Sequence, residues 1–269
     1  MTALTDRNAL NRNRQRHQPQ ALFLHRQAIA ELQDRLGMVN RTFHQSVIVS
    51  GFPLIWQTAF PDAQILPDQD TLAATPDSSD LVIHAMALHW ANDMVGQLIQ
   101  CRRTLQPDGL FLAACFGGQT LFELRTTLAE AEIEITGGLS PRIAPMAEIR
   151  DLGGLLQRAG FALPVADSTR LTVTYPSVRH LMRELRAMGE NNALASRLRH
   201  PTKAAVLRRT EQIYNERHHR DDGTIAATFE MIYLTGWAPH ASQPKPLRPG
   251  SATTRLSTAL KTQETLLKD

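Results

Sequence analysis

Three short apolar stretches constrain the fold of this 269-residue chain more than any other feature. Residues 46–50, 80–84 and 109–115 read SVIVS, DLVIH and GLFLAAC, and none of them alternates apolar with polar side chains. Strands without alternation are typical of a parallel sheet that helices cover on both faces. The intervening segments place apolar residues at spacings of three and four, which predicts helices. The sequence therefore predicts an α/β fold with a doubly wound, mostly parallel sheet.

The expected organisation has three parts along the chain. Residues 1–45 begin with an arginine-rich loose arm or frayed helix at 1–20, and a helix follows from Leu22. Residues 46–240 form the sheet domain, with a turn at 106–109 and later strands at 171–175 and 227–237. Residues 176–220 hold two helices, which predicts a helical insertion before the last strand. Residues 241–269 form a tail with a short helix near 256–266.

The composition of the chain indicates the class of protein and the cellular compartment. Hydrophobic residues make up 42% of the chain, which is typical of a globular protein and not of a disordered one. The longest apolar run, 110–116, is far shorter than the roughly 20 residues that a membrane span needs. No export signal is recognisable, so we expect a cytoplasmic protein without an integral membrane span. Cys101 and Cys115 have no metal-ligand spacing and are expected to be small core residues.

Positive charge is concentrated in two segments. Residues 1–26 contain five arginines and one aspartate, and residues 176–220 contain ten lysines or arginines and four glutamates. Such segments attract acidic proteins, anionic lipids or nucleic acids, although a solvated helix surface is the explanation that we favour.

The turn after the first strand is where a nucleotide-binding sheet carries its glycine-rich loop. Here residues 50–53 read SGFP, so Gly51 is the one glycine and the proline lacks an amide donor. The GxGxxG pattern is absent, which disfavours a dinucleotide dehydrogenase. Asp68 is our choice for the acidic residue that would hold a ribose, with Asp62 and Asp70 as competitors. About thirty residues separate the first strand from Asp80, which leaves little room for a full strand-helix-strand-helix unit.

The segment after the second strand contains further candidates. His84, Ala85 and Met86 would lie at the carboxyl edge of the sheet, where they would face a cofactor. His89 could act as an acid or base near neutral pH, or it could pack with Trp90 beneath the insertion. The five-residue spacing of the two histidines fits no metal-binding pattern.

Two charged residues follow the third strand. Glu123 stands three residues after Thr120, a spacing typical of a capping box, although a catalytic role is the alternative. Arg142 lies in a loop between glycines and Pro145, where it could hold an anionic group of a ligand.

Several motifs resemble a known family. Residues 80–83 and 88–93 resemble the fourth-strand region of class I S-adenosylmethionine-dependent methyltransferases. Within that class the chain resembles the mitochondrial complex I assembly factor with a methyltransferase fold, and its alphaproteobacterial relatives. The further matching stretches are 105–111, 116–125, 137–142, 151–161, 188–192, 236–240 and 243–252. More distantly, the chain resembles the malonyl-carrier-protein methyltransferases of biotin synthesis.

This resemblance implies a seven-stranded sheet, S-adenosylmethionine at its carboxyl edge and a role in building respiratory complex I. The mitochondrial relative is implicated in hydroxylating an arginine of a complex I subunit. Gly51, Asp68 and residues 84–86 would then bind the cofactor, while His89, Glu123 and Arg142 would face a protein substrate. The family's aspartate and glycine-rich turn are missing after the first strand, so the cofactor is expected to bind weakly or to be lost.

Two other functions compete with this prediction. A non-catalytic assembly chaperone would use the same surface only for binding. A nucleic-acid-binding protein would use the basic insertion, but that segment lacks the interleaved aromatic residues that stack on bases.

Overall fold

The computed structural model of the chain describes residues 3–244, 251 and 254–262. Met1–Pro239 form one compact unit, and His240–Asp269 form a second. In the second unit, α9 (Leu256–Leu260) begins where the tail helix was predicted. Residues 263–266 of that predicted helix lie outside the described residues.

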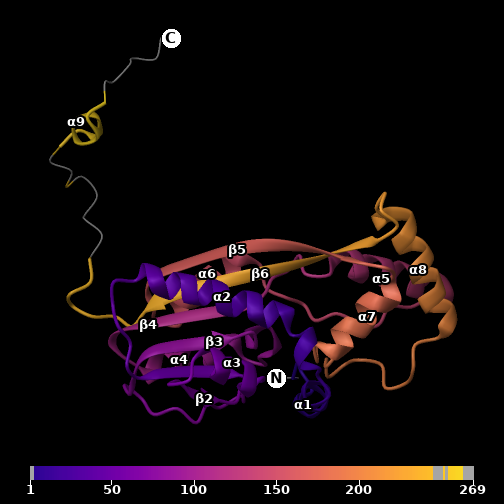
Figure 1. Cartoon of the computed structure of the whole chain (residues 1–269), viewed down its shortest axis with the longest axis horizontal. Helices are drawn as coiled ribbons and strands as arrows, with labels where there is room; N and C mark the ends of the chain where they lie inside the picture. Colours follow the sequence, from indigo (N-terminus) through magenta and orange to yellow (C-terminus); the bar gives the residue numbers. More distant parts are fainter. Residues whose placement is uncertain (1–2, 245–250, 252–253, 263–269) are drawn as a thin grey trace. The chain divides into compact units, whose positions relative to one another are not determined.

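Six strands of the described chain form one sheet in the order β2-β1-β3-β4-β6-β5 (Figure 1). The strands are β1 Ser46–Ser50, β2 Gln64–Leu66, β3 Ser79–Ala85, β4 Leu105–Phe116, β5 Ala162–Tyr175 and β6 Ile225–Trp237. The first four are parallel to one another, whereas β6 runs antiparallel to both β4 and β5. The predicted α/β sheet is therefore confirmed, with one antiparallel strand, β6, between β4 and β5.

The seventh strand that the resemblance implies is missing from the described residues. Only α3 (Pro53–Ala59) and the three-residue β2 connect β1 to β3. A parallel crossover needs a dozen or more residues for each added strand, so this connection has room for one strand only. The sheet is thus shortened beside β1, the strand that carries the cofactor turn.

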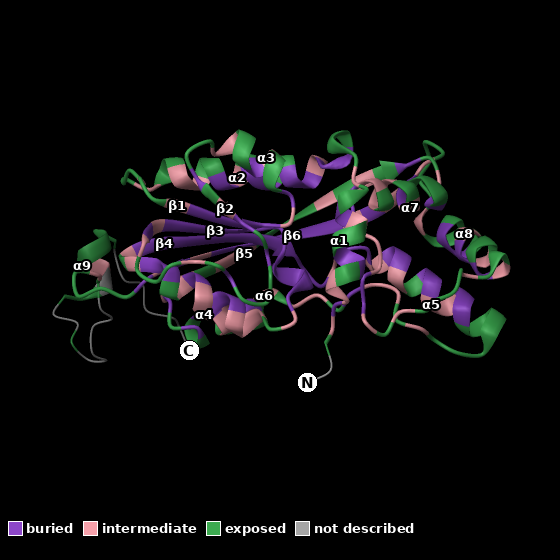
Figure 2. Cartoon of the chain, turned by 90° about the horizontal axis from the view of Figure 1, so that it is seen from below, coloured by how far each residue is buried: buried purple, intermediate pink, exposed green. Residues whose placement is uncertain are grey.

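Helices cover both faces of the sheet (Figure 2). On one face lie α2 (Phe23–Met38) and α3, and on the other lie α4 (Met94–Thr104) and α6 (Ile149–Arg158). Successive residues of β1 divide between the two layers, because Ile48 packs on the α2 side and Val47 and Val49 pack on the α4 side. Burial on both faces explains why the strands show no polar alternation.

Three more helices lie beyond the carboxyl ends of the parallel strands (Figure 1). They are α5 (Phe122–Thr136), α7 (Val178–Ala187) and α8 (Ala204–His218), and the last two lie within residues 176–220. Ala131 of α5 packs against Val206 and Ile213 of α8. None of the helices within the described ranges has the length and apolar character needed to cross a bilayer.

Two local predictions are wrong, and a third gives a strand that is too short. Residues 7–15 form a regular helix, α1 (Arg7–Gln15), and its Leu10 is fully buried, so this segment is neither a loose arm nor frayed. The turn expected at 106–109 is an irregularity inside β4, where Asp108 adopts φ 63°. The strand expected at 171–175 already begins at Ala162, because β6 pairs with it over that longer span.

Candidate functional site

The parallel strands end side by side at one edge of the sheet. Ser50 of β1 pairs with Ala85 of β3, and Ala85 pairs with Ala114 of β4. Open α/β sheets bind their ligands at this edge. In Figure 1, α1 and α7 lie at the same end of the sheet. The candidate site is therefore enclosed by the N-terminal segment and the helical insertion.

Arg14 of α1 fills the space beside Gly51. A Cβ atom added to Gly51 would collide with the guanidinium of Arg14. From Nη1, Arg14 donates hydrogen bonds to both carboxylate oxygens of Asp68, at 2.7 and 2.9 Å. The two side chains are only 5% and 7% exposed. A charge buried to this extent needs a hydrogen-bonded partner of opposite charge, so the chain itself satisfies Asp68.

The segment that carries Arg14 is held at several points. The amide of Thr5 donates to Oδ1 of Asn92 at 2.8 Å. Asp6 caps α1, and its carboxylate also pairs with Arg197 at 3.0 Å. The hydrogen bond from the Ala9 amide, followed by those from Arg197 and Arg199, lowers the pKa of Asp6 to about 2. The N-terminal segment is thus tied both to the sheet domain and to the loop between α7 and α8.

A cavity of about 440 Å³ remains beside the Arg14–Asp68 pair. Ser50, Gly51, Phe52, Pro53, Ile65 and Pro67 contribute to its wall.

Three features of this crevice disfavour the binding of S-adenosylmethionine. The acid assigned to its ribose is already paired with Arg14. The amide of Phe52 donates to Oγ of Ser50 at 3.0 Å, and Pro53 has no amide to offer. The residues present therefore do not fit this cofactor in the arrangement described.

Residues 84–86 are buried, each with at most 1% of its surface exposed. Nε2 of His84 lies 3.3 Å from Oε1 of Gln97 on α4. Burial lowers the pKa of His84 to about 4, so its ring is neutral at pH 7. Met86 adopts φ 51° and its amide donates to the carbonyl of Ala114 at 2.9 Å. Among the described residues, these three do not line the cavity beside Gly51.

A short 3₁₀ helix, η2 (Leu88–Trp90), brings two aromatic rings to Glu190, which follows α7. Nε1 of Trp90 donates to Oε2 of Glu190 at 2.7 Å, and Nε2 of His89 lies 3.5 Å from the same oxygen. The His89 ring is 1% exposed and lies 4.7 Å from the ring of Phe116, between centroids. This placement matches the interpretation in which His89 packs beneath the insertion.

Glu190 is an ionised carboxylate within this cluster. Burial acts to raise its pKa, but His89, Arg14 and Trp90 together lower it further than burial raises it. Within the described residues, Oε1 of Glu190 has no hydrogen-bond partner. A buried carboxylate oxygen without a partner is unusual in a folded protein.

A second cavity of about 290 Å³ lies beneath the insertion, next to Glu190. Its lining is mainly apolar and includes Trp90, Phe116, Leu124, Ile143, Met182 and Leu185. Arg142 also contributes to the wall. Such a combination of apolar walls and a few charged groups is typical of sites that bind small groups.

The guanidinium of Arg142 is largely occupied by the chain. It donates to both carboxylate oxygens of Glu132, at 3.0 and 2.6 Å, and to Oγ1 of Thr202 at 2.8 Å. Burial acts to raise the pKa of Glu132, but Arg142 and Ser140 lower it to about 2. Arg142 therefore links its loop to α5 and to the segment that precedes α8, and a ligand would have to compete for it.

The predicted capping box at 120–123 is wrong. The helix begins at Phe122, and no side chain caps it, because Leu121 precedes it in the left-handed conformation at φ 54°. Glu123 instead accepts hydrogen bonds from the amide and the hydroxyl of Thr228 on β6, at 3.2 and 2.5 Å. Thr120 exchanges hydrogen bonds with the backbone of Glu230 on the same strand. Long-range pairing with β6 has replaced the local cap.

Two observations concern metal ligands and cysteines. In residues 3–244, 251 and 254–262, no three His, Cys, Asp or Glu side chains are grouped as metal ligands. Burial raises the pKa of both Cys101 and Cys115 to about 12, so neither is a thiolate at neutral pH.

Sequence patterns do not single out Arg14 or Glu190, although both lie at the centre of the site. Arg14 is one of five arginines in residues 1–26, and its partner lies 54 positions further on. Glu190 belongs to the matching stretch 188–192, which was the one signal that could have indicated it.

The sheet, its two helical layers and the crevice at its carboxyl edge define a class I methyltransferase fold. The crystal structure of a candidate methyltransferase from Bacillus halodurans C-125 shares this fold, with a TM-score of 0.51 and 13% identity. The likeness covers 79% of this chain and 99% of that one. No protein-family model matches the sequence.

Sequence relatives narrow the class to a family. The chain is 38% identical over 218 residues to the mitochondrial arginine-hydroxylase NDUFAF5 of Danio rerio, covering 80% of this chain and 67% of that protein. It is 35% identical over 188 residues to the malonyl-[acyl-carrier protein] O-methyltransferase of Laribacter hongkongensis, covering 70% and 61% of the two chains. The chain belongs to the NDUFAF5 family, which confirms the resemblance in its motifs. It spans only 42 to 62% of the length of four other NDUFAF5 proteins.

Proposed function

We propose that this chain acts on a protein partner during the assembly of respiratory complex I, with a degenerate site for S-adenosylmethionine. Membership of the NDUFAF5 family supports the assembly role. The helical insertion and the N-terminal segment form a large surface around the carboxyl edge of the sheet, which supports a macromolecular partner. A cytoplasmic location stays a prediction.

One observation carries the proposal of a degenerate cofactor site: the buried pair of Arg14 and Asp68 beside Gly51. A cofactor bound there would have to displace the guanidinium and take over its two hydrogen bonds. The same observation favours a second candidate function, a non-catalytic assembly chaperone that keeps the fold as a binding platform.

Calorimetric titration of the purified chain with S-adenosylmethionine tests the cofactor site. Losing one or two charge-assisted hydrogen bonds, at about 1.5–3 kcal/mol each, weakens binding by a factor of between roughly 10 and 20,000. We therefore expect a Kd well above a micromolar. A Kd at or below about one micromolar would contradict the degenerate site.

Deletion of the gene in the source organism tests the assembly role. We expect native gels to show less fully assembled complex I, and the wild-type gene to restore it. Unchanged complex I in the deletion strain would rule out this function. If a variant that binds no S-adenosylmethionine restores complex I assembly, the chain acts as a chaperone and not as an S-adenosylmethionine-dependent enzyme.

A further inference from the structure

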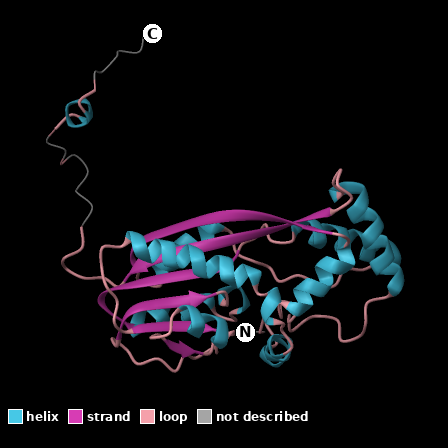
Figure 3. Cartoon of the chain, in the orientation of Figure 1, coloured by secondary structure: helices cyan, strands magenta, loops and turns pink. Residues whose placement is uncertain are grey.

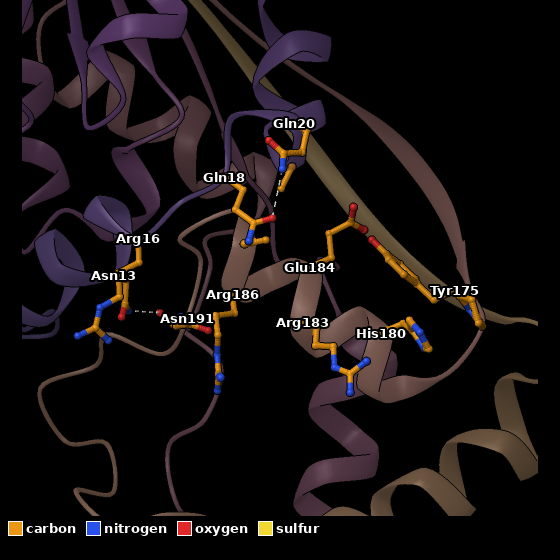
Figure 4. A pocket seen from close by; sticks show the side chains of 13 residues that line it. Asn13, Arg16, Gln18, Gln20, Tyr175, His180, Arg183, Glu184, Arg186 and Asn191 are labelled. Atoms are coloured by element: carbon orange, nitrogen blue, oxygen red, sulfur yellow. Dashed lines mark hydrogen bonds between the residues drawn. The ribbon is translucent and has the colours of Figure 1, made fainter.

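A polar groove separates the N-terminal segment from α7, outside the crevice (Figure 4). Its volume is about 1010 Å³, at the upper limit of sites for drug-sized molecules. One wall comes from residues of α1 and of the segment after it, and the other comes from α7. The polar side chains around it are Asn13, Arg16, Gln18, Gln20, His180, Arg183, Glu184, Arg186 and Asn191.

Arginines from both walls give this groove a positive charge. Arg16 comes from the N-terminal wall, and Arg183 and Arg186 come from α7 (Figure 4). All three are exposed, and across the described part of the chain their side chains have no hydrogen-bond or ion-pair partner. The one acidic side chain, Glu184, is turned toward the Tyr175 hydroxyl (Figure 4).

Other arginines of the insertion are paired within the fold. Arg179 pairs with Glu211 at 3.3 Å. Arg209 and Arg217 pair with two glutamates of α5, at 2.6 and 2.7 Å. These pairs link α7, α8 and α5, so the charge of those arginines is balanced internally. The groove arginines keep their charge available for a ligand.

Hydrogen bonds between the two walls hold them at a fixed separation. The amide of Gln18 donates to the carbonyl of Ala187 at 2.7 Å, and Nδ2 of Asn13 donates to the carbonyl of Asn191 at 3.2 Å. Gly189 adopts φ 81°, and a Cβ atom there would lie 3.1 Å from Cα of Arg14, so the walls approach closely. Walls that are fixed before binding lower the entropic cost of capturing a ligand.

We propose that this groove binds an acidic, extended segment of the protein partner, with its carboxylates paired to Arg16, Arg183 and Arg186. Arginine and carboxylate form strong, directional hydrogen bonds. Among the described residues that line the groove, Tyr175 is the only Phe, Tyr or Trp, and it is 5% exposed, so the groove offers nucleic-acid bases no exposed ring for stacking other than the imidazole of His180. This inference rests on the proposed function insofar as the partner is a protein.

Fluorescence anisotropy on the full chain tests the groove. The probe is a short fluorescein-labelled peptide of alternating Glu and Gly, and its Gln-for-Glu counterpart is the control peptide. The groove variant carries Arg16→Glu, Arg183→Glu and Arg186→Glu. The matched control variant carries Arg12→Glu, Arg103→Glu and Arg208→Glu, which are exposed arginines outside the groove. Both variants lower the formal charge of +3 by the same amount.

We expect the groove variant to bind the acidic peptide at least about tenfold more weakly, and the control variant to stay within about twofold of wild type. Binding should weaken as salt rises, because exposed charges are screened. Thermal melts of both variants should match wild type, since all six arginines are exposed.

Three results would overturn the proposal. One is no preference of wild type for the Glu peptide over the Gln peptide. Another is an equal loss of binding in both variants. The third is that wild type binds an RNA oligonucleotide or phosphatidylserine vesicles more tightly than the acidic peptide, and that only the groove variant loses this binding. Complex I assembly is measured in a separate experiment. If the chain binds the peptide but the deletion strain still assembles complex I, the proposed function is contradicted and the proposed binding in the groove is retained.

Discussion

Replacing Arg14 with alanine tests directly whether the chain closes its own crevice. The substitution removes the guanidinium that donates to both oxygens of Asp68 and leaves that carboxylate 7% exposed. Removing one partner of a buried ion pair destabilises a protein by about 3–5 kcal/mol. Arg7 lies 3.5 Å from the same carboxylate and is 22% exposed, so it offsets part of the loss. We expect Arg14→Ala to lower the free energy of unfolding by about 3 kcal/mol.

Urea unfolding followed by circular dichroism measures this change by linear extrapolation. Thermal melting should show a fall in Tm of roughly 6–12 °C, because 1 kcal/mol corresponds to about 2–4 °C in a chain of this size. Arg12→Ala is the matched control: it removes an exposed arginine from the same helix and should change stability by less than about 0.5 kcal/mol. The double variant Arg14→Met, Asp68→Leu should recover most of the loss, because apolar residues of similar volume replace a buried pair at little cost.

An Arg14→Ala protein as stable as Arg12→Ala would refute this reasoning. It would mean that α1 does not insert its arginine beside Gly51 in solution. Failure of the double variant to recover stability would have a narrower meaning: the loss would then come from other contacts of Arg14, such as its position 5.5 Å from the centroid of the Phe52 ring.

Three further predictions concern the surrounding contacts. Gly51→Ala should cost about 1–3 kcal/mol in urea unfolding because its methyl group meets the Arg14 guanidinium, and the cost should largely disappear when Arg14→Ala is also present. Glu123→Gln should cost about 1 kcal/mol by weakening the hydrogen bonds to Thr228, and it should leave complex I assembly intact in the complementation test. Glu132 has a folded pKa of about 2 against an ordinary value of 4.5, so its stabilisation is complete above about pH 4.5 and is lost as the pH falls toward 2. Glu132→Gln should therefore flatten the pH dependence of stability in that window, and an unchanged acid-unfolding profile would contradict this assignment.

The sheet could be predicted from the sequence because its cause is local. β1, β3 and most of β4 are continuous apolar runs, and the burial of both faces leaves no other place for such residues. The short connection between β1 and β3 could also be predicted, because the number of residues between the two strands limits how many further strands can lie there.

The centre of the candidate site could not be predicted because its contacts are non-local. The Arg14–Asp68 pair spans 54 positions, and the hydrogen bond from Trp90 to Glu190 spans 100. No spacing rule selects one arginine among five in residues 1–26. The capping box failed for the related reason that Thr228 on β6 offered Glu123 two donors across 105 positions. A local capping pattern does not form when residues of a distant strand make hydrogen bonds to the same polar group.

The Arg14–Asp68 pair affects ligand affinity in the crevice independently of how many glycines residues 50–53 contain. A ligand that binds beside Gly51 must first separate Arg14 from Asp68, and its apparent affinity falls by the free energy of that separation. If the pair contributes about 3 kcal/mol, the loss is a factor of roughly one hundred to two hundred, even for a ligand whose own contacts are perfect. Restoring glycines to residues 50–53 would therefore not restore tight binding while α1 remains docked. Contacts on both sides of α1 join the N-terminal segment to the sheet and to the insertion, so undocking of α1 would open the crevice and remove one wall of the groove together. A ligand in the crevice and an acidic segment in the groove should accordingly oppose each other's binding, by the same factor in both directions.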